Sequence, residues 1–157
     1  MIMNVMTIKG FFYTTFKKYF NFKGRASRAE FIWWHIYLIV ISLLLGMALS
    51  NFLTNKQFEA FSSIYGLLML IPNISLTVRR LHDSSNSGWL ILICFVPWFL
   101  LAVIGNIFFN IFSAYLLSTV ISYISIVPII YLYYLILFKA GDNESNKYGI
   151  LDNDYKN

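Results

Sequence analysis

Charged residues are scarce in this sequence, and their scarcity argues against an ordinary soluble domain. Only 12% of the 157 residues are charged, which is about half the proportion usual in soluble proteins. Hydrophobic residues make up 59% of the chain, more apolar surface than a soluble core of this size can enclose. A bilayer removes the difficulty because it is itself an apolar solvent, so the composition predicts an integral membrane protein.

Cysteine is almost absent, and so are the motifs that carry most chemistry. The single cysteine, Cys94, excludes a disulfide within the chain and a metal site built from several thiolates. It lies in an apolar run, where we expect a buried, inert thiol. No metal-ligand spacing, phosphate-binding glycine loop or nucleophile elbow is present. We therefore predict no catalytic residue, no metal and no cofactor, and a membrane-embedded enzyme is the least favoured hypothesis.

Long apolar runs take the place of these motifs. No charged residue occurs between Ser84 and Phe138, and a single helix of that length would extend about 80 Å. A bilayer core is about 30 Å thick, so this stretch should cross twice, with a break between Gly105 and Ser113. The sequence predicts an all-α integral membrane protein, a four-helix transmembrane bundle forming one membrane domain over residues 1–150. The predicted spans are 31–53, 58–78, 89–104 and 114–138, and residues 151–157 form a polar tail.

Residues 7–21 have the pattern of a short amphipathic helix before the first span. Aromatic residues recur at helical spacing on one side, and the lysines lie mainly off that stripe. Such a helix can lie in the headgroup layer as an interfacial helix. It can equally pack against the cytoplasmic end of the protein itself, and the sequence leaves both alternatives open.

The basic residues are distributed unevenly about the predicted spans. With four spans, the N-terminus, the loop after residue 78 and the C-terminal tail share one side and carry every lysine and arginine except Lys56. Because positive charge collects on the cytoplasmic side, both termini are predicted to be cytoplasmic. The net charge of +5 is thereby explained by orientation and anionic lipid, and no nucleic acid partner is expected.

Each of the last three spans contains one proline, namely Pro72, Pro97 and Pro128. A proline inside a helix frees the carbonyl four residues earlier and bends the axis. Three bends at a similar depth would open a cavity towards the cytoplasm. The alternative is that the bends only improve packing, as prolines often do in membrane helices.

Charged side chains of both signs flank the first two spans on the cytoplasmic side. Arg25, Arg28 and Glu30 precede the first span, and the run from Arg79 to Asp83 follows the second. Arginine pairs bind phosphate or carboxylate through forked hydrogen bonds. The alternative is purely topological, with the arginines anchoring the inner side and the acids balancing them. Ser27 is expected to cap the first span, with Glu30 as its capping-box partner.

Three motifs, in order, resemble one known family. FKGRASRAEFIWW (Phe22–Trp34) resembles the opening of the YhaH-type bacterial inner-membrane proteins, known as domain of unknown function 805. VRRLHD (Val78–Asp83) with SGW (Ser87–Trp89) resembles the central signature of that family, and GDNESNKYG (Gly141–Gly149) resembles its closing signature. The resemblance implies a small multi-pass protein of the bacterial inner membrane and implies no established activity.

The three motifs all map to the predicted cytoplasmic boundary, so we predict a ligand-binding site there. A topological role would need basic residues but not a defined order of Arg-Arg-Leu-His-Asp followed by Ser-Gly-Trp. The predicted ligand-binding residues are Arg25, Arg28, Glu30, Arg79, Arg80, His82, Asp83, Trp89, Asn146 and Tyr148. The first functional hypothesis is that this cluster binds or transports an anionic membrane lipid or small metabolite.

The second hypothesis is a structural or regulatory subunit that acts through helix–helix contacts. Small residues four apart form two stripes, Ser42/Gly46/Ser50 and Ala114/Ser118/Ser122. Such stripes allow close helix packing in membranes, so a second copy of the chain or another membrane protein would be the partner.

Overall fold

The computed structural model describes residues 8–111, 113, 115–142 and 144–149, and this part of the chain is built from helices. They are α1 (Ile8–Lys17), α2 (Arg28–Leu49), α3 (Asn55–Asp83), α4 (Leu90–Asn110) and α5 (Tyr115–Leu137). Helices α2 to α5 are long and apolar enough to cross a membrane. The predicted all-helical fold, with four long apolar helices as candidate spans after a short N-terminal helix, is therefore confirmed. The predicted polar tail, 151–157, lies outside the described residues.

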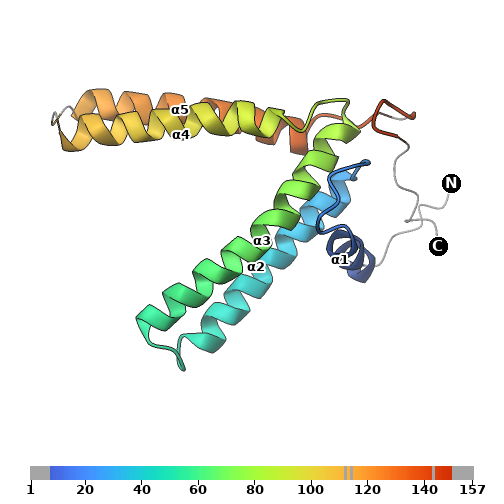
Figure 1. Cartoon of the computed structure of the whole chain (residues 1–157), viewed down its shortest axis with the longest axis horizontal. Coiled ribbons are helices and arrows are strands. Elements are labelled where there is room, and N and C mark those ends of the chain that lie inside the picture. The colour runs from blue at the N-terminus through green and yellow to red at the C-terminus, as the bar shows by residue number, and fades with distance from the viewer. Residues whose placement is uncertain (1–7, 112, 114, 143, 150–157) are drawn as a thin grey trace.

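The four long helices are arranged as two antiparallel hairpins that meet at one end and diverge from it (Figure 1). We call this meeting end the vertex. Helices α4 and α5 pack closely because Gly105 faces α5, where an added Cβ would lie 3.4 Å from the Ser122 Oγ. Ser118 and Ser122 of the second small-residue stripe thus serve packing within the chain, while Ala114 lies outside the described residues.

Helix α3 is longer than the predicted span, 58–78, and it includes the first part of the central motif, Val78–Asp83. It contains 29 residues, about 44 Å at 1.5 Å per residue, whereas a bilayer core is about 30 Å thick. Residues Arg79–Asp83 were expected in a loop but form its last turns. The helix therefore extends beyond the apolar layer and presents this motif at the boundary.

Helix α1 packs on the protein's own helices, the second of the two alternatives. Thr14 and Thr15 are buried, and the Thr15 hydroxyl donates to the Glu30 carboxylate over 3.2 Å. The Phe16 ring meets the Trp34 ring of α2 edge-on, with centroids 5.1 Å apart. The N-terminal helix is thereby fixed against α2 and close to the vertex.

The backbone around Pro72 is also stabilised by the N-terminal segment. Proline frees the Leu68 carbonyl from its helical partner, and the Tyr19 hydroxyl donates a hydrogen bond to that oxygen. Ser75, one turn later, is buried and donates to the Lys18 carbonyl over 3.4 Å. The residues that follow α1 thus satisfy a backbone group that the proline would otherwise leave unpaired.

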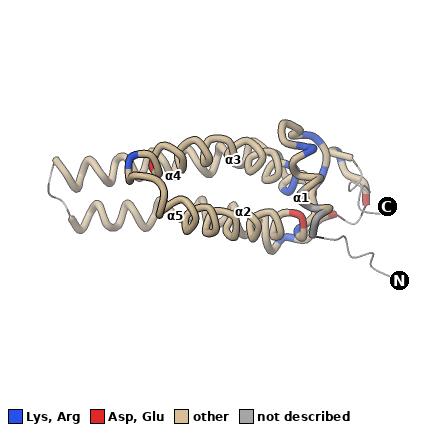
Figure 2. Tube along the Cα trace, turned by 90° about the horizontal axis from the view of Figure 1, so that it is seen from below, with Lys and Arg blue, Asp and Glu red and all other residues tan. Residues whose placement is uncertain are grey.

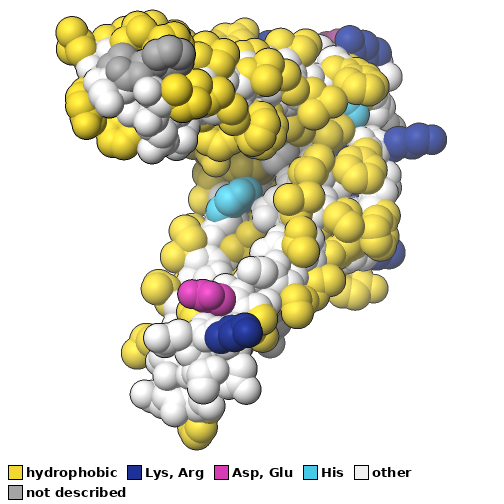
Figure 3. Space-filling view, turned by 60° about the vertical axis from the view of Figure 1, so that its left-hand side comes forward, with side chains coloured by type: hydrophobic (Ala, Val, Ile, Leu, Met, Phe, Trp, Pro, Cys, Tyr) yellow, Lys and Arg dark blue, Asp and Glu magenta, His cyan; other side chains and the backbone are white. Residues whose placement is uncertain are grey.

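Polarity and burial are concentrated at the vertex. In Figure 2 most lysines and arginines gather at the end of the molecule that holds α1. Lys56 and Glu59 belong to the first turns of α3, at the other end of that helix from Asp83. The buried apolar side chains, among them Trp34, Leu76 and Leu135, also gather where the hairpins meet. Away from the vertex the apolar side chains form the outer surface, which is hollowed between the hairpins (Figure 3). An apolar outer surface of this kind is suited to lipid.

Candidate functional site

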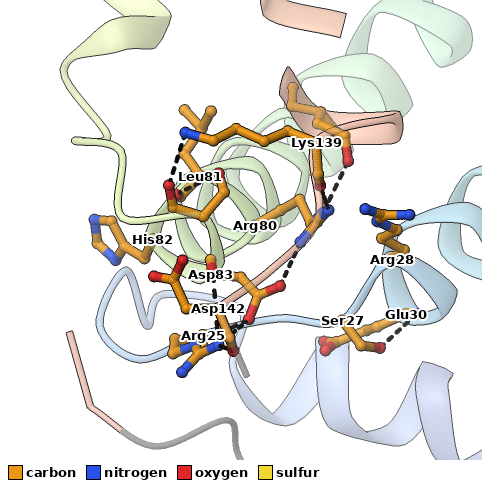
Figure 4. Close-up of polar contacts among 12 residues, drawn as sticks. Arg25, Ser27, Arg28, Glu30, Arg80, Leu81, His82, Asp83, Lys139 and Asp142 are labelled. Carbon is orange, nitrogen blue, oxygen red and sulfur yellow. Dashed lines mark hydrogen bonds and ion pairs between the residues drawn. The ribbon is translucent and has the colours of Figure 1, made fainter. Parts of the chain in front are cut away.

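Asp83, at the end of α3, is the centre of the polar contacts at the vertex (Figure 4). Its Oδ1 accepts from the Arg25 Nε at 2.9 Å and lies 2.8 Å from the Arg25 Nη2. Its Oδ2 accepts from Arg80 of the preceding turn. Arg25, Arg80 and Asp83 are all buried, at 1%, 0% and 5% exposure. We call these three residues the arginine–aspartate cluster.

The two guanidinium groups are occupied by the backbone of the C-terminal segment. Arg25 donates to the Glu144 carbonyl at 2.6 Å and also to the Asp142 carbonyl. Arg80 donates through its Nε to the Ile136 carbonyl and through its Nη2 to the Lys139 carbonyl, each at 2.8 Å. The cluster therefore connects the segment before α2, α3, the end of α5 and the closing motif (Gly141–Gly149), and it leaves few donors for a foreign anion.

Gly141 fits against the cluster because it has no side chain. A Cβ at this position would lie 1.9 Å from the Asp83 Oδ2, which is closer than a side-chain carbon can approach an oxygen. The next residue continues the contact, since the Asp142 amide donates to the Asp83 carbonyl over 2.8 Å. The glycine that opens the closing motif thus allows the C-terminal segment to pass over the buried carboxylate.

The remainder of the closing motif folds back onto the end of α3. The side-chain amide of Asn146 donates to the His82 carbonyl at 2.9 Å and to the Asp142 carboxylate at 2.8 Å. Hydrogen bonds from Ser85 and Asn146 lower the pKa of Asp142, and they do so because they stabilise its charged form. Asn146 and Gly149 pair in a tight turn, with Gly149 at φ +109°. This turn sets the position of Tyr148.

A second buried ion pair lies on the α1 side of α3. The Arg79 Nη1 donates to the Glu30 Oε1 at 3.0 Å, and both side chains are fully buried. The Arg79 Nε and Nη2 are buried without a hydrogen-bond partner. Ser27 caps the N-terminus of α2, and its hydroxyl accepts a hydrogen bond from the backbone N–H of Glu30 at 3.1 Å. The Glu30 carboxylate thus serves the contact between α1, α2 and α3.

An open groove runs beside the cluster at the vertex. The His82 and Tyr148 rings stack at its wall, 3.7 Å apart and 6° from parallel, and the His82 Nδ1 donates to the Gly24 carbonyl over 3.2 Å. The groove has a volume of about 600 Å³. It is mainly apolar and is lined by Phe22, Ile74, Val78, His82, Ser87, Gly88, Trp89, Ile91, Leu92 and Tyr148. We call it the boundary groove.

Two features of the central motif shape this groove. Gly88 packs against α3, where an added Cβ would lie 2.8 Å from the Val78 Cγ1, so the loop after α3 must approach closely. Trp89 follows and is 70% exposed. Lys147 lies over the outer face of the stack, with its Nζ 4.9 Å from the Tyr148 ring centroid. The groove thus has apolar walls and a basic rim.

The structure divides the predicted site residues into three groups. Arg25, Arg80, Asp83 and Asn146 join the network around Asp83, Glu30 and Arg79 form the second pair, and His82, Trp89 and Tyr148 line the boundary groove. Arg28 stands apart, exposed, and donates to the Phe138 carbonyl at 3.0 Å. The sequence analysis missed the apolar walls, Phe22, Val78 and Leu92, because nothing distinguishes them from lipid-facing residues. Within the described residues, no group of three or more His, Cys, Asp or Glu side chains is placed to hold a metal ion.

Comparison with known proteins places these motifs in a family. Residues 19–150 match the sequence family DUF805, whose description is "Protein of unknown function". Inner membrane protein YhaH of Escherichia coli (strain K12) is 33% identical over 93 residues, which cover 55% of this chain and 76% of the relative. Inner membrane protein YhaI of the same strain is 36% identical over 99 residues, covering 55% and 75%. No solved structure gives a significant match.

Proposed function

Because the chain belongs to the DUF805 family of multi-pass inner-membrane proteins, whose description records no activity, we propose a function from the vertex itself. The protein binds an anionic lipid of the cytoplasmic leaflet in the boundary groove. The observation that carries this proposal is the groove of about 600 Å³ whose apolar walls end at the His82–Tyr148 stack. The buried arginines beside it act as supports and not as headgroup ligands.

The walls and the rim of the groove match the two parts of such a lipid. Ile74, Val78 and Leu92 supply an apolar surface for an acyl chain. Lys23 is exposed and follows Phe22, a lining residue, in the sequence. Lys147 lies over the ring of Tyr148, another lining residue. Exposed lysines attract anionic headgroups by about 1 kcal/mol each near a membrane surface. The rim therefore favours a phosphate-bearing headgroup over a zwitterionic one.

The proposal includes the orientation of the chain. The vertex holds the described lysines and arginines other than Lys56, together with the described parts that adjoin both termini, and positive charge favours the cytoplasmic side. Single-cysteine variants made in a Cys94→Ser background test it in whole cells with a membrane-impermeant maleimide. Lys56→Cys should react from the periplasm and Ser145→Cys should not. The reverse pattern would overturn the orientation and with it the choice of leaflet.

Native mass spectrometry of protein released from nanodiscs tests lipid binding directly. Nanodiscs of phosphatidylglycerol and phosphatidylcholine in equal parts should yield protein that retains phosphatidylglycerol. Leu92→Trp fills the groove and should abolish retention. The matched control is Leu100→Trp, which lies on the same helix, is 52% exposed against 49% for Leu92, and does not line the groove. Equal retention by both variants would refute the groove as the site.

The headgroup is tested by charge reversal at the rim. Lys23→Glu together with Lys147→Glu should remove the preference for phosphatidylglycerol over phosphatidylcholine. Lys56→Glu, at the opposite tip of the molecule, should leave the preference unchanged. Loss of preference in the Lys56 variant alone would place the headgroup elsewhere.

One observation favours a second function, a subunit acting through helix contacts. Gly46, in the stripe of Ser42, Gly46 and Ser50, has open space around the position of an added Cβ. The stripe is therefore not used for packing within the described chain. Gly46→Leu should break a complex that survives mild detergent, as measured by size-exclusion chromatography with light scattering. A particle of monomer mass before and after the substitution would exclude this function.

A further inference from the structure

A second recess lies where the hairpins meet, deeper along the helices than the boundary groove. It has a volume of about 310 Å³ and is lined by all four long helices. Its polar lining residues are His35 of α2, Asn73 and Thr77 of α3, and Tyr133 of α5. We call it the vertex recess. Ile74 and Ile91 line both cavities, so the two adjoin.

The hydrogen bonds within the recess determine what it can still offer to a ligand. The His35 Nδ1 lies 2.8 Å from the Phe31 carbonyl, and a carbonyl oxygen only accepts, so the Nδ1 carries the proton. In the uncharged imidazole the Nε2 is then an acceptor. The Thr77 hydroxyl donates to the Asn73 carbonyl at 2.7 Å, which leaves its oxygen lone pairs free to accept. Both groups have used their donors and keep acceptors.

The charge of the lining limits the ligand further. No lysine, arginine, aspartate or glutamate occurs among the described residues that line the recess. An ionised group would therefore enter an apolar setting without a counter-ion, which is costly within a bilayer. The remaining lining side chains, such as Phe31, Leu132 and Ile136, suit hydrocarbon. The fitting ligand is uncharged, apolar in bulk and able to donate a hydrogen bond.

From this set of acceptors we infer that the vertex recess binds an uncharged lipid through its free hydroxyl group, whose one hydrogen is donated to the His35 Nε2, with the Thr77 Oγ1 as the alternative acceptor. Diacylglycerol is the simplest lipid of this class. The inference goes beyond the anionic-lipid site, because that site uses the basic rim and this one uses uncharged acceptors between the hairpins.

Two lipids that differ only in the donor test the inference on the full-length protein. Nanodiscs of phosphatidylcholine are doped with dioleoylglycerol or with its 3-O-methyl ether, and retention is measured by native mass spectrometry. Dioleoylglycerol should be retained about tenfold better, which is the order expected for one buried hydrogen bond. Equal retention of the alcohol and the ether would overturn the inference.

Variants separate a binding role of His35 from a structural one. His35→Leu should abolish the preference for the alcohol, and His35→Gln, which keeps an acceptor, should restore part of it. Thr77→Val should weaken the preference while helical content by circular dichroism stays unchanged. A preference that persists in both His35→Leu and Thr77→Val would also refute the assignment.

The groove variant distinguishes this inference from the proposed function. Leu92→Trp fills the boundary groove but does not line the recess, so it should lose phosphatidylglycerol and keep the preference for dioleoylglycerol. If phosphatidylglycerol retention fails in the parent protein while that preference holds, only the anionic-lipid proposal falls. If the preference fails while phosphatidylglycerol is retained, only the recess assignment falls.

Discussion

Asp83 forms ion pairs with two arginines at the vertex, Arg25 and Arg80. One carboxylate, 5% exposed, is shared by two buried guanidinium groups. Removing one partner from a buried ion pair costs about 3–5 kcal/mol, because the remaining charge is left without compensation. Any change that displaces this carboxylate should therefore destabilise the vertex as a whole.

Gly141→Ala should displace Asp83 without changing any charge. Its Cβ would lie 1.9 Å from the Asp83 Oδ2, so either the carboxylate or the C-terminal segment must move. We expect a loss of about 3 kcal/mol, the lower end of the cost of breaking a buried pair, measured by thermal unfolding in detergent. Gly66→Ala is the control, because an added Cβ there meets no atom within 4 Å. Equal unfolding midpoints for the two variants would contradict the argument.

Asp142 should make the closing motif sensitive to acid. Its pKa lies below the usual value because Ser85 and Asn146 donate to its carboxylate. A lowered folded-state pKa contributes stability above the ordinary carboxyl pKa of about 3.9, and that stability is lost as the pH falls through the folded-state pKa. Between pH 7 and pH 3 the parent should therefore lose more stability than Asp142→Asn does, as measured by unfolding midpoints. Parallel curves for the two proteins would exclude this role.

Among the elements, α3 shows best what the sequence pattern could and could not predict. Its apolar run and Pro72 predicted a kinked span, and the freed Leu68 carbonyl was identifiable from the proline alone. The partner of that carbonyl, Tyr19, was not, because it lies 49 residues away along the chain. The end of the helix was also missed, since Arg79–Asp83 is polar and polar runs after a span resemble loops. The contacts of Asp83 with Arg25 and Arg80 fit this helical end of α3 and are made between residues far apart or on neighbouring turns.

The Tyr19 contact can be measured by a double-mutant cycle with the proline. Tyr19→Phe removes the donor to the Leu68 carbonyl and should cost about 1 kcal/mol in unfolding free energy. Pro72→Ala restores the helical amide donor to the same carbonyl, so Tyr19→Phe should cost much less in that background. The coupling between the two substitutions is the quantity that the cycle reports. A cost of Tyr19→Phe that is the same in both backgrounds would show that the hydroxyl acts elsewhere.

At the scale of the whole molecule, the arrangement of the hairpins depends on polar contacts that the sequence could not reveal. The charge asymmetry and the three motifs correctly predicted that the signatures would meet at one end. The divergence of the hairpins was not predictable, because α4 and α5 are apolar on nearly every face and give no pattern for the side that packs. The boundary groove escaped prediction for the same reason, since its walls are ordinary apolar residues such as Val78 and Leu92.

Arg80 should be the residue that holds the two hairpins at a fixed angle. It belongs to α3 and donates to the Ile136 and Lys139 carbonyls at the end of α5, at 2.8 Å each. Spin labels at Asn51→Cys and Asn110→Cys, one at each hairpin tip, report the separation in a Cys94→Ser background. We expect a narrow distance distribution in that background and a broad one after Arg80→Gln, with helical content by circular dichroism unchanged.

Arg28→Gln supplies the matched control for this experiment. Arg28 also contacts the end of α5, but it is exposed and donates to the Phe138 carbonyl alone, at 3.0 Å. Hydrogen bonds from a charged donor are worth about 1.5–3 kcal/mol when buried, and exposed ones contribute less because water competes for the same groups. Arg28→Gln should therefore broaden the distribution much less than Arg80→Gln does. If the two variants broaden it equally, the hairpins are held by the apolar contacts at the vertex and not by the buried guanidinium group.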